Sequence, residues 1–439
     1  MRLKEEMGTI VLSPLALAFA SLIASLAIGR AGGTGNMFWL TESETNFPNI
    51  NEALASAFPD QHSEATQGTV ARLRNHLQAN DAKGLPRAAV FTLAKNIKCR
   101  QGECNQGKGC SQSQSVALLA ASLENTLFKR SPYPLIIFHE DWEDSDFAPV
   151  VQAAPSTLVI WHKINMAEQG LPDYVDVHPD SGVTGRRDRI IDAFKAVHMK
   201  GDLTLGSKDG KGFHGFGYRM MCRFFSGLVH HAPLLREVDY YMRLDGGDSR
   251  LDSVTQDPFA VMRAKGARYG YYEEPKHCCA IPSYVLRHCI ASLLVDNATI
   301  HKNMSSVPKV FQYDTPANFK SFKNLKCGDL APHGGVSKIP LIPSHVRSGM
   351  PFFAYNNFEV VDMRYFRSST HWALFMKVER SLAFFCIDGT ACKPNARATP
   401  GIGDAPFRGY SLSLVLDHPN QIIALKNSTK YRHPVPPCG

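Results

Sequence analysis

The sequence predicts an α/β fold built around a largely parallel sheet, and three short apolar runs carry this prediction. Residues 88–94, 134–139 and 157–161 are each almost entirely apolar over five to seven positions, as buried strands of parallel sheets are. Between the first two runs lies a stripe at helical spacing, made of Val116, Leu118, Leu119, Leu123 and Leu127. A strand, a helix and a strand at this spacing form a right-handed β-α-β unit, so we expect the strands to run parallel.

A fourth strand is predicted at Val238–Leu244, where apolar and polar residues alternate with the two-residue period of a sheet. It ends on Asp245-Gly246-Gly247-Asp248, which places two carboxylates at the end of a strand. Hard cations prefer oxygen ligands, so Asp245 and Asp248 are predicted metal ligands. The alternative is a plain tight turn, because Asp-Gly is the commonest turn signal.

Length, composition and charge narrow the class of protein. With 439 residues, 44% of them hydrophobic, the chain can bury a large core in one big domain or two. The net charge of +8 suits acidic ligands such as phosphates. We find no clustered basic helix and no aromatic-basic stripe, so nucleic acid is not an expected partner.

The eleven cysteines favour disulfides in an oxidising lumen, because none of them forms a C-x-x-C pair. Residues 99–110 are predicted to form a loop closed by a disulfide. A zinc site at residues 277–289 is the alternative, but its histidines and cysteines lack ligand spacing. An odd count leaves at least one free thiol or an intermolecular bond.

The N-terminal region predicts a membrane anchor. Residues 1–7 form a polar tail with Arg2 and Lys4, and residues 8–29 carry no charge over a length that can span a bilayer. Basic residues before the span place the N-terminus in the cytosol. The alternative is a signal peptide cleaved near Ala27. Residues 30–85 are predicted to be a luminal stem with a short helix at 70–80, and residues 86–439 the catalytic domain.

A helix is predicted at Tyr218–Val229, with Arg219 and Arg223 four residues apart on one face. These arginines either face solvent or bind the diphosphate of a ligand. Asp257-Pro258 is a strong helix start, with Asp as N-cap and Pro in the first turn. Three glycosylation sequons fit exposure to a lumen; they begin at Asn297, Asn303 and Asn427.

Six blocks of sequence, taken in order, resemble one known family. They are Tyr218–Gly227, Tyr241–Asp245, Asp257–Arg263, Asn357–Ser368, Gly403–Pro406 and Tyr431–Pro434. Together they resemble the α-1,2-mannosyltransferases of glycosyltransferase family 15 over residues 86–438. The resemblance implies a GT-A-like fold, that is, a single Rossmann-type nucleotide-sugar-binding domain with a mixed sheet. It also implies a single-pass type II Golgi membrane protein that transfers mannose from GDP-mannose with retention of configuration, usually with Mn²⁺.

The resemblance also assigns roles to single residues. Glu359 matches the family's proposed catalytic carboxylate, and Asp245 matches the acidic residue of its metal motif. The predicted donor-binding residues are Tyr218, Met221, Arg243 and Arg408. Simpler roles remain open: a surface carboxylate for Glu359, a salt bridge to Asp245 or Glu359 for Arg243, and a core residue for Tyr218. Cys222 is predicted to be structural.

Two departures from the family pattern bear on the metal and the acceptor. The family's metal-binding His is Arg408 here, and its Arg-Trp pair is Gly401-Ile402, behind an insertion at about residues 386–400. Arginine cannot ligate a cation. Either Mn²⁺ still binds, more weakly, through Asp245 and Asp248, or the Arg408 guanidinium takes its place at the diphosphate.

The expected function is therefore a retaining α-1,2-mannosyltransferase. It would use GDP-mannose and a mannosylated glycan of a glycoprotein (N- or O-linked) or a glycolipid. Glu359 would be the nucleophile or a charge stabiliser, needed for turnover but not for folding. The alternatives are a catalytically weakened relative that binds a glycan or a partner, and a secreted lectin.

Overall fold

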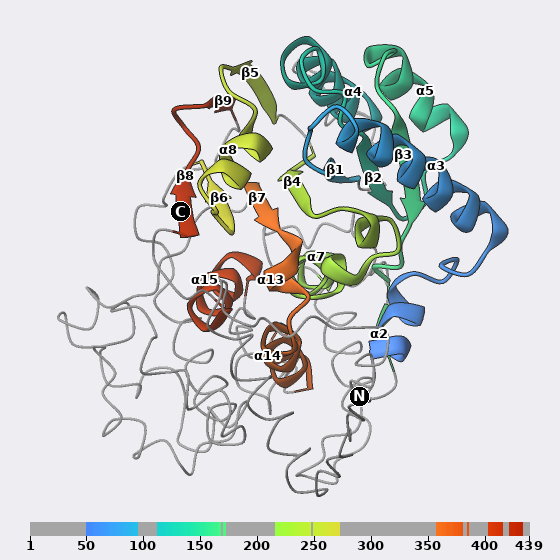
Figure 1. Ribbon diagram of the computed structural model, residues 1–439. Helices are drawn as coiled ribbons and strands as arrows, with labels where there is room; N and C mark the ends of the chain where they lie inside the picture. The colour runs from blue at the N-terminus through green and yellow to red at the C-terminus, as the bar shows by residue number, and fades with distance from the viewer. Residues whose placement is uncertain are drawn as a thin grey trace, which may run out of the picture. The chain divides into compact units, whose positions relative to one another are not determined.

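The core of the protein is a seven-stranded mixed sheet. The computed structural model gives the strand order β3-β2-β1-β4-β7-β6-β8, which Figure 1 shows from green β3 to red β8. These strands are β1 (Ala88–Ala94), β2 (Leu135–His139), β3 (Val159–Lys163), β4 (Tyr240–Leu244), β6 (Tyr269–Tyr271), β7 (Phe358–Asp362) and β8 (Ile422–Ala424). Neighbours pair in parallel except at β7, which is antiparallel to both β4 and β6. The α/β class and the four predicted strands are confirmed.

The structure describes residues 50–94, 112–167, 170–172, 216–246, 249–272, 357–380, 384–385, 403–415 and 421–432. All of them belong to one compact unit, Leu40–Gly439, and the other unit, Met1–Trp39, lies outside the described residues. The predicted anchor at 8–29, Asp248, the zinc alternative and every cysteine except Cys222 also lie outside them. No helix in the described ranges is both long and apolar enough to cross a bilayer.

The remaining elements are mostly helices. Those before β4 are α2 (Ile50–Ala57), α3 (Glu64–Asp81), α4 (Gln112–Leu123), the π-helix η2 (Glu124–Phe128), α5 (Asp144–Ala153), α7 (Phe216–Ser226) and the 3₁₀ turns η5 (Leu228–His231) and η6 (Leu234–Glu237). After β4 come α8 (Pro258–Ala264), α13 (Met363–Phe366), α14 (Ser369–Arg380) and α15 (Asp404–Val415). A separate two-stranded antiparallel sheet is formed by β5 (Arg250–Val254) and β9 (Thr429–Arg432).

One face of the sheet packs against α4, α5 and α8. The alternate strand residues Val90, Leu135, Met242 and Val360 share a single apolar cluster with these helices. The predicted stripe of α4 and η2 is buried there, except that Leu118 is 52% exposed. Leu118 lies two positions from Val116, which turns it by about 200° on a helix of 3.6 residues per turn, away from the sheet.

The opposite face is covered by aromatic side chains from α7 and from the chain after α2. Phe91 of β1 lies 4.9 Å from the Tyr241 ring of β4, and Phe138 of β2 lies 5.5 Å from Phe224 of α7, measured between ring centroids. Phe225 of α7 also contacts Phe91. This second face also carries the polar residues of the candidate active site described below, which therefore lie next to these aromatic side chains.

The two N-terminal helices belong to the same body as the sheet. The Phe58 ring, just after α2, contacts both Phe138 and Phe224, and Arg74 of α3 makes two 2.9 Å hydrogen bonds to Glu237. Residues 50–85, assigned above to a stem, are therefore part of the folded unit. The short helix expected at 70–80 is the central part of the longer α3.

Gly227, between α7 and η5, gives a test of how tightly the second face is packed. A Cβ placed there would lie 2.3 Å from the Phe375 ring. We expect Gly227→Ala to lower the free energy of unfolding by about 1–3 kcal/mol through overpacking. The matched control is Gly68→Ala in α3, where nothing lies within 4 Å of the added Cβ. It should raise stability by up to about 1 kcal/mol through helix propensity. Equal urea midpoints for the two variants would contradict the packing argument.

Candidate active site

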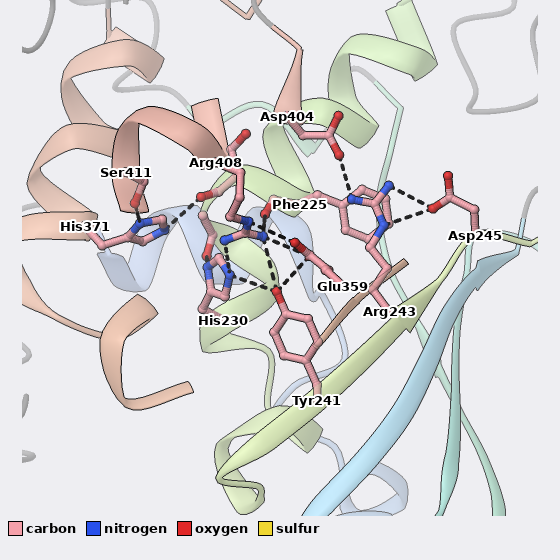
Figure 2. Close-up of polar contacts among 12 residues, drawn as sticks. Phe225, His230, Tyr241, Arg243, Asp245, Glu359, His371, Asp404, Arg408 and Ser411 are labelled. Atoms are coloured by element: carbon pink, nitrogen blue, oxygen red, sulfur yellow. Dashed lines mark hydrogen bonds and ion pairs between the residues drawn. The ribbon is translucent and has the colours of Figure 1, made fainter. Parts of the chain in front are cut away.

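The candidate site lies where β4 and β7 run side by side on the second face of the sheet. Arg243 of β4 and Glu359 of β7 are register partners in this antiparallel pair, so their side chains point to the same face. Tyr241 lies two residues before Arg243 and shares that face. Figure 2 shows α15 bringing Asp404 and Arg408 onto this pair of strands.

Arg243 is held between two aspartates and an aromatic ring. Its Nε and Nη2 lie 2.9 and 2.8 Å from Asp245 Oδ1, and its Nη1 lies 2.6 Å from Asp404 Oδ2. The guanidinium stacks on Phe225, with 3.4 Å between Cζ and the ring centroid. Burial opposes its charge, but Asp245 and Asp404 outweigh burial and raise the pKa of Arg243 above its ordinary value. The structure thus shows the salt bridge to Asp245 that the sequence left open.

Glu359 is completely buried and paired with Arg408. Arg408 Nε and Nη2 lie 3.1 Å from the two carboxylate oxygens, and the Tyr241 hydroxyl donates to Oε1 at 3.0 Å. The Glu359 and Arg408 side chains are 0% and 2% exposed. Glu359 lies within β7 and is fully buried, so its interpretation as a surface carboxylate on a turn is wrong. Burial opposes the charge of Arg408, yet Glu359 outweighs it and raises the pKa of Arg408.

Two buried histidines extend this network. The Arg408 Nη1 group lies 3.0 Å from His230 Nε2, and arginine only donates, so Nε2 accepts and Nδ1 donates to the Gly227 carbonyl at 3.1 Å. Burial, and next the Arg408 charge, hold the pKa of His230 well below its usual range. His371 likewise contacts the Ser226 carbonyl through Nε2 at 2.9 Å and Ser411 through Nδ1. Both rings are therefore neutral, fixed hydrogen-bonding groups.

Of the other predicted donor residues, Tyr218 and Met221 lie one turn apart on α7, and both are only partly buried. Tyr218 connects to the site through Cys222 and Asp404. The Cys222 thiol, burial and the Asp404 carboxylate together raise the pKa of Tyr218 well above its usual value. Burial raises the pKa of Cys222 to about 12, which supports its structural role because the thiolate is the reactive form.

Arg219 and Arg223 do not form a solvated face. Both are buried, and Arg223 makes a two-pronged ion pair with Glu379 at 2.8 and 2.9 Å and donates to the Gly170 carbonyl at 2.9 Å. Arg223 therefore ties α7 to α14, and its donors are directed at protein acceptors rather than at a diphosphate.

Sequence reasoning missed the roles of four residues: Tyr241, His230, His371 and Asp404. Strand alternation could have placed Tyr241 beside Arg243, and Asp404 already lay within a family-like block. No local pattern marks His230 and His371, because their partners come from residues distant in sequence.

Asp245 is the one described residue of the predicted metal pair. Its side chain is 31% exposed, and both Arg243 contacts end on Oδ1, while Figure 2 shows the second oxygen pointing away from Arg243. In the described part of the chain, no group of three or more His, Cys, Asp or Glu residues could hold a metal ion. The oxygen of Asp245 that Arg243 does not contact could serve as one ligand of a hard cation.

Comparison with known proteins agrees with the family resemblance. The sequence model of the family described as "Glycolipid 2-alpha-mannosyltransferase" matches residues 46–278, more than half of the chain. The chain is 24% identical over 303 residues to O-glycoside alpha-1,2-mannosyltransferase homolog 4 of Schizosaccharomyces pombe, covering 67% of this chain and 61% of that protein. The chain thus spans about three fifths of the length of this curated relative.

Two solved structures are similar to this one. Core-mannan synthase A (CmsA/Ktr4) from Aspergillus fumigatus, in an Mn/GDP form, gives a TM-score of 0.46 at 18% identity and covers 79% of this chain and 74% of its own. The mannosyltransferase Ktr4p from S. cerevisiae in complex with GDP gives 0.49 at 16% identity, with 88% and 85% covered. The match to the family's sequence model decides the assignment: the chain belongs to the glycolipid 2-alpha-mannosyltransferase family.

Proposed function

We propose that this chain is a GDP-mannose-dependent, retaining α-1,2-mannosyltransferase. The observation that carries the proposal is the meeting of Arg243, Asp245 and Glu359 at the carboxyl end of β4 in a member of this family. Ligands of open α/β sheets bind at the carboxyl ends of the strands. Asp245 is the most exposed of these three side chains, as expected of the group nearest the ligand.

The reaction breaks the bond between the mannose anomeric carbon and the diphosphate oxygen and forms a bond from that carbon to an acceptor hydroxyl oxygen. The hydroxyl proton leaves to the diphosphate or to solvent. Positive charge develops on the sugar and negative charge on the diphosphate. Among the described residues, Glu359 is the carboxylate bonded to Arg408 and Tyr241, and its fixed negative charge would stabilise the sugar cation. Its two-point pairing with Arg408 favours the stabilising role over nucleophilic attack, because a nucleophile must release such bonds first.

The cofactor is proposed to be Mn²⁺, held by Asp245, by Asp248 outside the described residues, and by the donor diphosphate. When bound, the ion neutralises charge on the leaving diphosphate. Arg243 orients Asp245 through Oδ1 and leaves the second oxygen for the ion.

Asp245→Asn tests this assignment. We expect it to weaken Mn²⁺-dependent GDP binding by about tenfold or more, and to leave GDP affinity in EDTA unchanged. Isothermal titration calorimetry with and without Mn²⁺ measures both. The matched control is Asp252→Asn, since Asp252 is 29% exposed and pairs with Arg432 at 2.8 Å on the separate β5–β9 sheet. Equal metal dependence in the two variants would exclude Asp245 as a ligand.

The acceptor is proposed to be a mannosylated glycan of a glycoprotein or glycolipid, and the site of action the Golgi lumen, with residues 8–29 as the anchor. The decisive experiment incubates the full chain with GDP-mannose, other nucleotide sugars and α-mannoside acceptors. Proton NMR then identifies the donor used and the anomeric configuration of the product. Transfer from another donor, or an inverted product, would overturn the proposal.

A second candidate is a catalytically weakened relative that binds a glycan or a partner. The complete burial of Glu359 behind Arg408 favours it, because a catalytic carboxylate must face the reacting sugar. Binding of mannosylated glycans without hydrolysis or transfer of any nucleotide sugar would select this candidate.

A further inference from the structure

We infer that Arg408 is a positioning residue that fixes Glu359, and not a contact of the donor diphosphate. The inference rests on the proposed function in one respect, that Glu359 is the catalytic carboxylate. It argues against one of the two alternatives drawn from the sequence, in which the Arg408 guanidinium takes the place of a metal ion at the diphosphate.

The first argument is the use of the guanidinium nitrogens. Nε and Nη2 donate to the two oxygens of Glu359, and Nη1 donates to His230 Nε2. Nη2 also lies 3.0 Å from the Phe225 carbonyl and 3.2 Å from the Tyr241 hydroxyl. All three nitrogens therefore have protein acceptors in a side chain that is 2% exposed. A diphosphate could bind them only by displacing the carboxylate.

The second argument is that the surroundings fix the plane of the guanidinium. Arg408 Cζ lies 4.4 Å from the centroid of the Phe366 ring, and Asp404, one turn earlier on α15, is bound by Arg243. The same helix is thus attached to β4 through Asp404 and to β7 through Arg408. A planar fork held in this way matches a carboxylate at two points, which a lysine cannot do.

The third argument is charge. A buried carboxylate needs a countercharge, and Arg408 is the one cation that the described residues place in hydrogen-bonding contact with Glu359. The other titratable groups facing the pair are Tyr241 and Arg243 from β4, Tyr269 from β6, His230 from η5 and His371 from α14. The two histidines are neutral, and Arg243 is shared between two aspartates.

The main test compares Arg408→Lys with wild type in the full chain. Lysine keeps the charge but loses the fork, so we expect kcat for mannose transfer to fall on the order of a hundredfold through misplacement of Glu359. KM for GDP-mannose and the Kd for GDP by calorimetry should not change. A donor contact would give the reverse, with weaker GDP binding and a preserved kcat, and would overturn the inference.

A second measurement does not depend on activity. In Arg408→Gln, Glu359 is buried without a countercharge. Burial then favours its protonated, neutral form in the folded state more than in the unfolded chain. Its contribution to stability is then present at low pH and lost as pH rises. Relative to the double variant Arg408→Gln/Glu359→Gln, the single variant Arg408→Gln should lose stability as pH rises, and Arg408→Lys should not.

If the difference in stability between Arg408→Gln and Arg408→Gln/Glu359→Gln did not change with pH, Arg408 would not be the residue that holds Glu359. If wild type transfers no mannose from any donor, the proposed function fails, yet the pH comparison and the GDP titrations still decide the role of Arg408.

Discussion

Replacing Glu359 with glutamine is expected to reduce mannose transfer by a thousandfold or more, on the order of the losses seen when a central catalytic group is removed. The glutamine is neutral, so it cannot stabilise the charge that develops on the sugar. GDP affinity should be retained, because no donor diphosphate contact is assigned to Glu359. Steady-state transfer and GDP calorimetry measure the two effects separately. Transfer at the wild-type rate would show that Glu359 is not the catalytic carboxylate.

The structure predicts that Glu359→Gln also lowers the stability of the protein, which the sequence did not suggest. Glu359 is 0% exposed and bonded to a buried arginine, so Glu359→Gln leaves the Arg408 charge uncompensated. We expect a loss of about 3–5 kcal/mol in the free energy of unfolding. Glu359→Gln/Arg408→Met should recover stability but not transfer. The control is Glu237→Gln, which breaks a two-pronged pair with Arg74, whose side chain is 50% exposed, and should cost about 1 kcal/mol or less.

Arg223→Met is expected to be the most destabilising change away from the site, at about 3–5 kcal/mol. Both Arg223 and Glu379 are 1% exposed, so removing one leaves the other buried and charged. Chemical denaturation measures the loss, and Arg223→Met/Glu379→Met should restore most of it. The surface variant Arg74→Met is the control, and its denaturation midpoint should stay close to that of wild type because an exposed ion pair contributes little.

Folded Arg223→Met should still bind GDP as wild type does. The Arg223 guanidinium is bound by the Glu379 carboxylate and by the Gly170 carbonyl, so its role is to hold α7 against α14. A specific loss of GDP affinity in protein shown to be folded would instead support the diphosphate clamp that the sequence allowed.

The sequence predicted the parts of the fold that local patterns determine. Apolar runs and alternation located β1, β2, β3 and β4, and the Asp257 cap located α8, where Asp257 Oδ1 accepts from the Phe259 and Ala260 amides at 2.9 and 3.3 Å. The folded role of α2 and α3 was missed because α2 spans only eight residues, and because α3 is largely polar and buries only a narrow stripe.

The sequence predicted which residues form the candidate site, but not which side chains pair with one another. Glu359, Arg243 and Asp245 meet as expected, whereas the position of Arg408 depends on contacts across 49 positions to Glu359 and 178 to His230. No period in the sequence encodes which guanidinium meets which carboxylate. The roles of Tyr218, Met221 and Asp248 remain predictions.

The antiparallel strand β7 has a consequence for the order in which the protein can be completed during synthesis. Chains fold N-terminal parts first as they emerge, and β1 to β4 can pair with one another early. Their partner on the open side of β4 follows only much later, since Tyr241 and Glu359 are 118 positions apart. Until then β4 presents an unpaired edge, together with an arginine whose partner Asp404 is 161 positions further along the chain. Nascent chains stalled before Phe358 should therefore bind chaperones through this edge, and release should coincide with the arrival of β7 and α15.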